Sequence, residues 1–171
     1  QSLGWLEAKT TLGDLATVRD GASTSEAYEI RKFVVSKESF PPSEECIKLI
    51  NTGSIDPFKI LWEEKKTRYL GFNGKQPVIS ASEFKKHFPK RYEQALQEHV
   101  SVAGLSKRIE AVVVPSGVYA AKSTVNLFPK SEICPHALCA YLNSDSTQRL
   151  YRQLYQGRSM GMEALNIGPR Q

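Results

Sequence analysis

The segment that most constrains the fold begins at Phe88 and runs FPKRYEQALQEH, through a basic turn, into an apolar strand. Phe88, Tyr92 and Leu96 recur every four residues, which places them on one stripe of a helix. Pro89 suits the first helical position, where a missing N–H costs nothing. The β-branched run 112–114 that follows is typical of a buried strand. The sequence therefore predicts a helix over 88–99 that leads onto a core strand.

Cations are dense at the start of this helical segment. Lys85, Lys86, Lys90 and Arg91 lie there, and the helix dipole favours anions rather than cations at a helix start. Their density needs another reason, and an anionic partner is the obvious one. A basic turn that ends at Arg108 then precedes the core strand. We interpret the segment as a scaffold that presents positive charge to a polyanion.

Composition and charge allow one domain with its own core. The chain has 171 residues, a net charge of +5 and a pI near 9.1. Between residues 59 and 91, nine lysines and arginines face three glutamates, which gives a net charge of +6. From residue 149 onward, four arginines face one glutamate. A basic stripe suits phosphates or an acidic membrane face, although a solvated surface explains a net charge of this size equally well.

Apolar runs, the N-terminal pattern and the cysteines indicate the cellular compartment. No apolar run approaches the roughly 20 residues that a membrane span needs, and the N-terminus carries no signal-sequence pattern. Cys46, Cys134 and Cys139 are an odd number without disulfide-framework spacing, which predicts a reducing cytoplasm. Because the chain begins with glutamine, we expect it to be part of a longer protein.

A hydroxyl-rich segment follows the first apolar residues of the chain. Gly21, Ser23 and Thr24 predict a loop, and the residues from Tyr28 to Val35 a strand. Hydroxyl groups near a cation such as Arg19 can bind phosphates or base edges. An ordinary serine-rich loop is an equally good interpretation.

A hairpin is predicted next. Asn73-Gly74 is a strong two-residue turn signal. The flanking strands would hold 69–72 and 78–79, so that Arg68 and Lys75 would lie near the hairpin ends. Farther along, residues 118–129 alternate well enough for one half-buried strand, with Lys122 near its middle.

The C-terminal part is predicted to be a helical closing segment over 133–160. Pro135 opens a first helix, Asn143-Ser144 interrupts it, and Ser144 or Ser146 caps a second helix that ends at Gly157. A short strand is predicted at 165–167. With about eight short strands in hairpin-like pairs and three or four helices, we expect one α+β domain over 1–171. Its sheet would be curved and mixed or antiparallel, with a basic helix and a C-terminal helix pair.

The sequence shows no catalytic constellation. It contains neither of the two glycine-rich phosphate-binding loops, Gly-x-x-x-x-Gly-Lys-Ser/Thr and Gly-x-Gly-x-x-Gly. Cys134, His136 and Cys139 lack the fourth ligand of a tetrahedral zinc site. Nothing marks a histidine as the base of a cysteine or histidine hydrolase, so that interpretation ranks last. We predict no enzymatic activity, no metal and no cofactor for this chain.

Three motifs carry a resemblance. LGDLATVRDGAST resembles the opening of target recognition domains in type I restriction specificity subunits. INTGSIDPFKILW, followed by FPKRYEQALQEH and a Lys-Arg turn, is similar to the TaqI-like C-terminal specificity domain of adenine-specific DNA methyltransferases and restriction–modification enzymes. ALCAYLNSDSTQRLYRQLYQGRSMGMEAL is similar to that family's closing segment. The residues that match the second motif are Ile55, Asp56, Phe88, Pro89, Tyr92, Leu96 and Arg108.

This resemblance implies a module that recognises a sequence in double-stranded DNA for a methyltransferase catalytic domain or subunit. That partner would flip the target adenine and methylate it with S-adenosylmethionine. This chain lacks the cofactor loop and the Asn-Pro-Pro-Tyr-type motif, so it is expected to bind DNA without catalysis. The alternative is a protein-docking or scaffold module that uses the C-terminal helices. The predicted DNA-binding residues are Arg19, Ser23, Thr24, Arg68, Lys75, Lys85, Lys86, Arg91, Lys107, Arg108 and Lys122.

Overall fold

The chain folds as an α+β protein, which confirms the predicted class. The structure, a computed structural model, describes residues 10–155 and 165–166. The helices are α1 (Leu12–Leu15), α2 (Thr24–Arg31), α3 (Ala81–His87), α4 (Pro89–Ala95), α5 (Pro135–Asn143) and α6 (Asp145–Tyr155), with 3₁₀ turns η1 (Lys37–Ser39) and η2 (Thr52–Ser54). The strands are β1 (Ala16–Asp20), β2 (Val35–Ser36), β3 (Cys46–Ile50), β4 (Ile55–Asp56), β5 (Lys59–Ile60), β6 (Thr67–Tyr69), β7 (Phe72–Gly74), β8 (Pro77–Ser80), β9 (His99–Ala103), β10 (Leu105–Ser106), β11 (Ala111–Val114), β12 (Val118–Ala120), β13 (Thr124–Pro129) and β14 (Leu165–Asn166).

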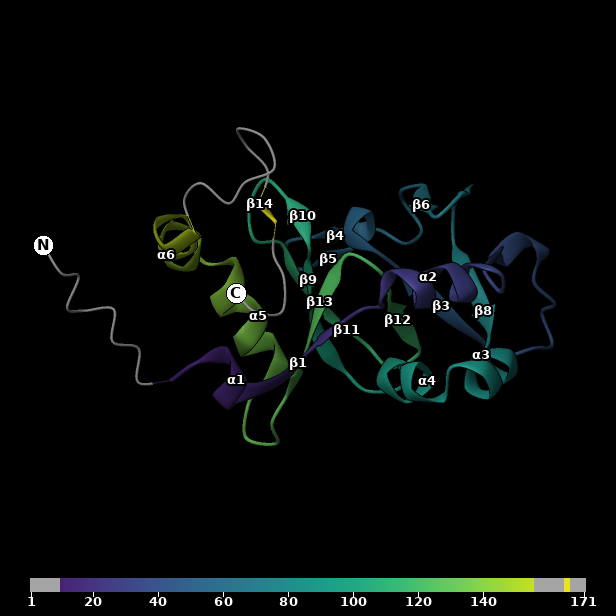
Figure 1. Cartoon of the computed structure of the whole chain (residues 1–171), viewed down its shortest axis with the longest axis horizontal. Helices are drawn as coiled ribbons and strands as arrows, with labels where there is room; N and C mark the ends of the chain where they lie inside the picture. Colours follow the sequence, from purple (N-terminus) through teal and green to yellow (C-terminus); the bar gives the residue numbers. More distant parts are fainter. Residues whose placement is uncertain (1–9, 156–164, 167–171) are drawn as a thin grey trace, which may run out of the picture.

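The longer strands form two four-stranded sheets in the part of the chain that the structure describes (Figure 1). The first sheet has the order β1-β13-β9-β11 and is antiparallel throughout. The second has the order β12-β3-β8-β2 and is mixed, because β12 runs parallel to β3. The remaining described strands pair as β4-β5, β6-β7 and β10-β14. The longer strands are thus divided between two sheets, whereas the sequence predicted one curved sheet.

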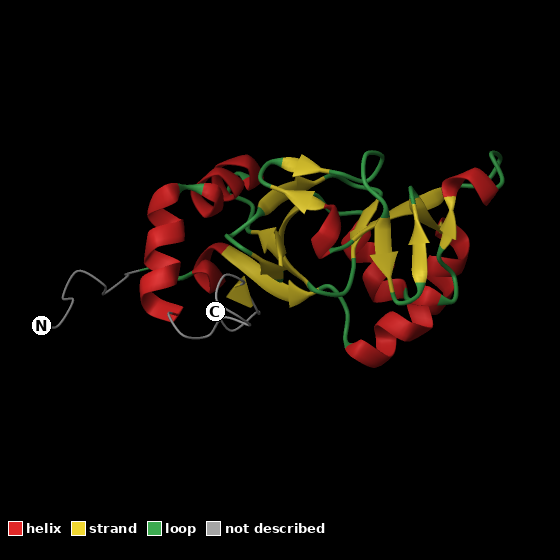
Figure 2. Cartoon of the chain, turned by 90° about the horizontal axis from the view of Figure 1, so that it is seen from above, coloured by secondary structure: helices red, strands yellow, loops and turns green. Residues whose placement is uncertain are grey.

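Three hydrophobic clusters hold these layers together. One packs α2, α3 and α4 on the second sheet, and another packs α5 on the first sheet. The third lies between the sheets and includes Ile50 and Val78 from one and Val112 and Val114 from the other. Figure 2 shows most helices toward the two ends of the molecule with the strands between them. The shared cluster makes the sheets one connected frame. No helix of the described residues is long and apolar enough to cross a membrane.

The predicted helix over 88–99 is shorter than expected and follows another helix. Helix α3 ends at His87 and α4 starts at Pro89, so that Phe88 caps both. Pro89 lies at the first helical position, as predicted. Residues 99–103 form the fully buried strand β9, which begins at the residue where the predicted helix was expected to end. The β-branched alternation HVSVA favours a strand once both its faces are covered.

The segment that was predicted to be a strand after Ser23 is helix α2. Ser23 and Glu26 form a capping box: the Glu26 N–H donates to Ser23 Oγ at 3.3 Å, and the Ser23 N–H donates to Glu26 Oε2 at 3.4 Å. The pattern Ser-x-x-Glu is the signature of a helix start. Of the predicted strand, only its last residue, Val35, belongs to a strand, the short β2.

The hairpin and one long strand also differ from the prediction. Leu70 and Gly71 make the turn between β6 and β7, both with positive φ (45° and 88°). Asn73-Gly74 lies inside β7, and residues 78–79 belong to β8, which pairs with β2 and β3. The predicted strand over 118–129 is two strands in different sheets, separated by Lys122 and by Ser123 with φ 66°.

The predicted C-terminal helix pair is confirmed. Helix α5 starts at Pro135, and Ser144 Oγ accepts a hydrogen bond from the Thr147 N–H at 3.2 Å, which caps α6. The short strand at 165–166 is present as β14, paired with β10. Gly157, the predicted end of the second helix, lies outside the described residues.

Side-chain amides join this helix pair to the edge of the first sheet. Asn143 accepts the Ala111 N–H at 2.9 Å and donates to the Ala111 carbonyl at 2.8 Å. Gln148 bonds the N–H and the carbonyl of Ile109 in the same way, at 2.8 and 2.9 Å. These two amides satisfy the groups that a neighbouring strand would otherwise pair.

Candidate nucleic-acid interface

Loops from both sheets meet where several strands end. The parallel strands β3 and β12 finish together at Ile50 and Ala120, and β1 and β9 finish beside the first residues of β13. Three backbone N–H···O bonds of 2.8–3.1 Å join the loops, from Gly21 to Thr124, from Gly104 to Ser123 and from Ala121 to Ile50. We call this region the strand-end junction; it comprises residues 19–24, 51–54, 104–108 and 121–123.

Polar side chains tie two further segments to the junction. Asn51 Oδ1 accepts the Gly53 N–H at 3.1 Å, and Asn51 Nδ2 donates to the Arg68 carbonyl at 2.7 Å. Thr52 Oγ1 donates to the Leu105 carbonyl at 3.2 Å. The backbone of β6, which bears Arg68, is thereby fixed next to the loop that begins at Gly104. In Figure 1, β6, β4, β10 and β14 accordingly lie along the upper side of the molecule.

Gly21 is required by the close approach of two of these loops. A Cβ atom at Gly21 would lie 1.7 Å from the Ala121 carbonyl oxygen and 2.4 Å from its carbon. From the other side, the Tyr119 hydroxyl donates to the Gly21 carbonyl at 2.6 Å. Burial raises the pKa of Tyr119 well above its usual range, so the hydroxyl keeps the proton that it donates. The start of α2 is therefore held against the loop that contains Lys122.

Six of the eleven predicted binding residues lie in the junction: Arg19, Ser23, Thr24, Lys107, Arg108 and Lys122. A seventh, Arg68, lies on β6, and its carbonyl accepts a hydrogen bond from Asn51 in the junction. All seven are exposed except Lys122, which is half-buried. The Lys122 Nζ atom lies 5.9 Å from the centre of the Tyr28 ring, whose residue is 56% exposed. The sequence analysis did not select Tyr28, because it assigned that residue to a strand. The junction thus combines cations, hydroxyls and an exposed aromatic ring, all of which bind nucleic acids elsewhere.

Two predicted cations lie toward the opposite end of the second sheet, and a third, Lys75, lies outside the junction residues. Lys85 and Lys86 are in the last turn of α3, whose first N–H donates to the Glu45 carbonyl at the amino end of β3, opposite the junction. A helix C-terminus favours cations, so their density there needs no anionic partner. Lys75 follows β7 and lies beside β2, where Ser36 Oγ donates to its carbonyl.

Arg91, a fourth predicted residue, is engaged inside the protein. Its guanidinium donates to both carboxylate oxygens of Glu26, at 2.8 and 2.7 Å, and to the Asp20 carbonyl at 2.9 Å. The Arg91 side chain is 17% exposed and that of Glu26 is 28% exposed. The hydrogen bonds from Arg91 hold the pKa of Glu26 below its usual value, against the opposing effect of burial. Arg91 therefore positions the start of α2 rather than facing a ligand.

Replacing Arg91 with alanine is expected to lower the free energy of unfolding by about 2 kcal/mol. Removing one partner from a fully buried pair costs about 3–5 kcal/mol, and partial exposure here reduces that cost. Lysine should not restore the loss, because it lacks the two-pronged geometry that Glu26 engages. Urea unfolding measures both variants. An Arg91→Lys variant as stable as the unmodified protein would contradict this assignment.

The same ion pair predicts a pH dependence. The pKa of Glu26 is lower in the folded protein than its ordinary value of 4.5. The contribution of the ionised Glu26 carboxylate to the free energy of unfolding is therefore fully present above pH 4.5. The contribution disappears as the pH falls from about 4.5 through the lowered folded pKa. We expect the stability difference between the unmodified protein and Glu26→Gln to shrink across this acidic range. A difference that stayed constant from pH 7 to pH 3 in urea titrations would show that Glu26 is not held ionised by Arg91.

The structure offers little chemistry around the histidines and cysteines. His99 is buried and stacks on Phe128 with ring centres 4.7 Å apart, and burial lowers its pKa. Cys139 is buried, donates to the Ala111 carbonyl and has a pKa raised by burial, which makes its thiol a poor nucleophile. Within residues 10–155 and 165–166, no group of three or more His, Cys, Asp or Glu side chains is placed to hold a metal ion.

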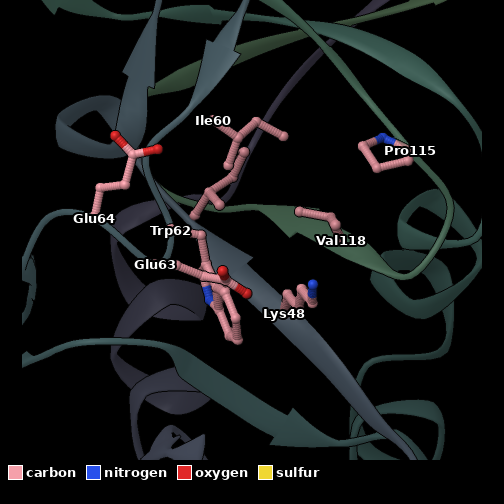
Figure 3. A pocket seen from close by; sticks show the side chains of 8 residues that line it. Lys48, Ile60, Trp62, Glu63, Glu64, Pro115 and Val118 are labelled. Atoms are coloured by element: carbon pink, nitrogen blue, oxygen red, sulfur yellow. The ribbon is translucent and has the colours of Figure 1, made fainter.

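A separate pocket of about 230 Å³ lies between β3, β12 and the segment after β5 (Figure 3). Its floor is apolar, formed by residues such as Ile50 and Val118. Lys48 extends over the Trp62 ring, with Nζ 4.6 Å from the ring centre, and Glu63 and Glu64 stand at the rim. None of the predicted DNA-binding residues lines this pocket. Its acidic rim makes it a poor place for a nucleic acid.

The alternative docking face on the C-terminal helices would consist of Tyr141, Leu142, Leu150, Leu154 and Tyr155. Its described side chains divide between core and surface. Leu142 is buried in the cluster under α5, and Leu150 is half-buried. Tyr141 is 55% exposed. The side chains of Leu154 and Tyr155 lie outside the described residues. Among the described side chains of this face, the Tyr141 ring alone is well exposed, which gives the docking interpretation little support.

Comparisons with known proteins leave the family open. No protein-family model matches the chain. A search of curated proteins finds no similar sequence.

Proposed function

We propose that this chain is a sequence-specific DNA target-recognition domain of an adenine-specific methyltransferase or restriction–modification protein. The observation that carries the proposal is the convergence of six predicted binding residues, from segments far apart in the sequence, at the strand-end junction, with a seventh, Arg68, on the strand bonded to it. Such residues are scattered if they serve only solubility. Their gathering on loops held by a rigid two-sheet frame is the arrangement that a binding site requires.

The residue types at the junction suit the two tasks of a DNA reader. Cations such as Lys107 and Lys122 can neutralise phosphates and fix the register of the protein on the duplex. Arg68 can donate two hydrogen bonds to one guanine edge in the major groove. Ser23 and Thr24, exposed at the start of α2, can bond either phosphates or bases. Base specificity would then depend on loop geometry.

The proposal includes a catalytic partner. The resemblance to specificity domains implies that the methyltransferase domain or subunit binds S-adenosylmethionine and modifies the adenine, while this chain selects the site. The chain itself would bind double-stranded DNA and hold no cofactor. The alternative function, protein docking without base readout, predicts association with that same catalytic part and no salt-sensitive DNA binding.

Salt-dependent binding of a labelled duplex by the full chain tests the proposal. In fluorescence anisotropy, Lys122→Ala should weaken binding and reduce the slope of log K against log salt by roughly 0.9, as expected for one lost phosphate contact. Arg68→Ala should weaken binding and relax the base preference, as expected for a lost base contact. Lys85→Ala is the matched control, since it removes one exposed lysine at the opposite end of β3. Equal losses in all three variants would contradict a site at the junction.

A further inference from the structure

A groove of about 440 Å³ lies between the loop that ends at Arg108 and one face of helix α6. Its lining residues are Arg108, Asp145, Gln148, Arg149 and Arg152. The four α6 residues follow the spacing of a single helical stripe, so they face the groove together. Three guanidinium groups and one carboxylate give this lining a formal charge of +2. The sequence analysis noted the basic C-terminal stretch but assigned no site to Arg149 or Arg152.

The groove has a fixed floor. Gln148 is only 9% exposed, and its amide bonds both the N–H and the carbonyl of Ile109, at 2.8 and 2.9 Å. This pair of bonds sets the distance between α6 and the chain that leads into β11. The groove walls therefore exist before any ligand arrives, which lowers the entropic cost of binding.

Two of the arginines are also positioned by backbone carbonyls. Arg152 Nη2 donates to the Lys107 carbonyl at 3.0 Å, and Arg108 Nη2 donates to the Asn143 carbonyl at 3.4 Å. Each of these bonds uses one of the five N–H donors of a guanidinium. One bond runs from α6 to the loop, and the other runs from the loop to the end of α5. They fix the planar guanidinium groups of Arg108 and Arg152 at the groove, and such groups can donate paired hydrogen bonds to phosphate oxygens.

We propose that this groove seats phosphates of the DNA backbone, next to the region where the strand-end junction contacts bases. This inference rests on the proposed function. The groove shares Arg108 with the junction, so a duplex that covers the junction can continue along it. A backbone contact of this kind is independent of sequence and fixes the orientation of the duplex. Arg149 and Arg152 are therefore assigned to affinity, and the junction loops to specificity.

Arg149→Ala, Arg152→Gln and the double variant test this inference in the same anisotropy assay. The slope of log K against log salt should decrease by roughly 0.9 for each arginine removed, and therefore by about 1.8 in the double variant. The loss should be equal on every duplex, whatever its sequence. Gln153→Ala is the matched control, because Gln153 is exposed on α6 but does not line the groove. Thermal unfolding of each variant confirms that the loss is not caused by unfolding of the chain.

Each possible result has a definite meaning. If the unmodified chain binds DNA and the arginine variants keep its slope, the groove assignment is wrong and the proposed function stands. If the loss appears only on one preferred sequence, these arginines recognise bases and the backbone assignment is wrong. If inorganic phosphate, at matched ionic strength, releases DNA from the unmodified chain more effectively than chloride does, the groove serves free phosphate instead. If the unmodified chain binds no duplex at low salt, both proposals fail.

Discussion

Replacing Gly21 with alanine is expected to lower the free energy of unfolding by about 3 kcal/mol, the upper part of the range for overpacking a filled site. The new methyl group would lie 1.7 Å from the Ala121 carbonyl oxygen, so the backbone of one loop must move. For a chain of this size the melting temperature should fall by roughly 6–12 °C. Because the moving loops carry Ser23 and Lys122, DNA binding should weaken even at temperatures where the variant is folded.

Gly53 provides the control for this prediction. It lies in the same junction, yet a Cβ atom there would be 3.5 Å from Asn51 Oδ1, an ordinary contact distance. Gly53→Ala should therefore change stability by less than about 0.5 kcal/mol, as exposed substitutions usually do. Calorimetry and anisotropy on both variants make the comparison. Equal behaviour of the two alanine variants would show that the loops do not meet as described.

Replacing Asn143 with alanine should cost about 2 kcal/mol. The substitution leaves the Ala111 N–H without its partner at the edge of the first sheet, whereas the Ala111 carbonyl still accepts from the Phe58 N–H and the Cys139 thiol. Each buried polar group left unpaired costs about 1–3 kcal/mol. Asn143→Asp should be no better, because it keeps the acceptor for the Ala111 N–H, loses the donor for the carbonyl and buries a charge.

Urea unfolding with Asn73→Ala as the control measures this effect. Asn73 is exposed in β7, and its loss should change stability by less than about 0.5 kcal/mol. Hydrogen exchange adds a local readout, since the Ala111 amide should lose protection in Asn143→Ala. Protection that persisted at Ala111 would mean that another group satisfies this edge, and the role assigned to Asn143 would then be wrong.

Local sequence signals led to correct predictions in some places and not in others. The start of α5 at Pro135 and the cap of α6 at Ser144 depend on neighbouring residues, and both were predicted correctly. Asn73-Gly74 favours a turn by itself, but Leu70-Gly71 takes that role because β8 pairs elsewhere. Tertiary pairing thus overrode a local preference. The capping box at Ser23 is also a local signal, yet a loop and a strand were predicted where helix α2 starts.

The residues of the candidate site were selected by type, as cations and hydroxyls, but their arrangement in space could not be predicted. Nothing local in the sequence shows that residues 21, 51, 104 and 121 adjoin. Only the order of the strands in the two sheets brings these loops together. For the same reason the partner of Arg91 was not foreseen, because Glu26 lies 65 positions earlier in the chain.

Selection from a pool of random duplex DNA tests the central claim most directly. The full chain would be incubated with the pool at low and moderate salt, and the retained duplexes sequenced. We predict enrichment of one short motif that contains an adenine, lost in Arg68→Ala and kept in Lys85→Ala. Salt-sensitive retention without enrichment would restrict the chain to backbone contacts and leave base reading to its partner. No retention at low salt would contradict the account.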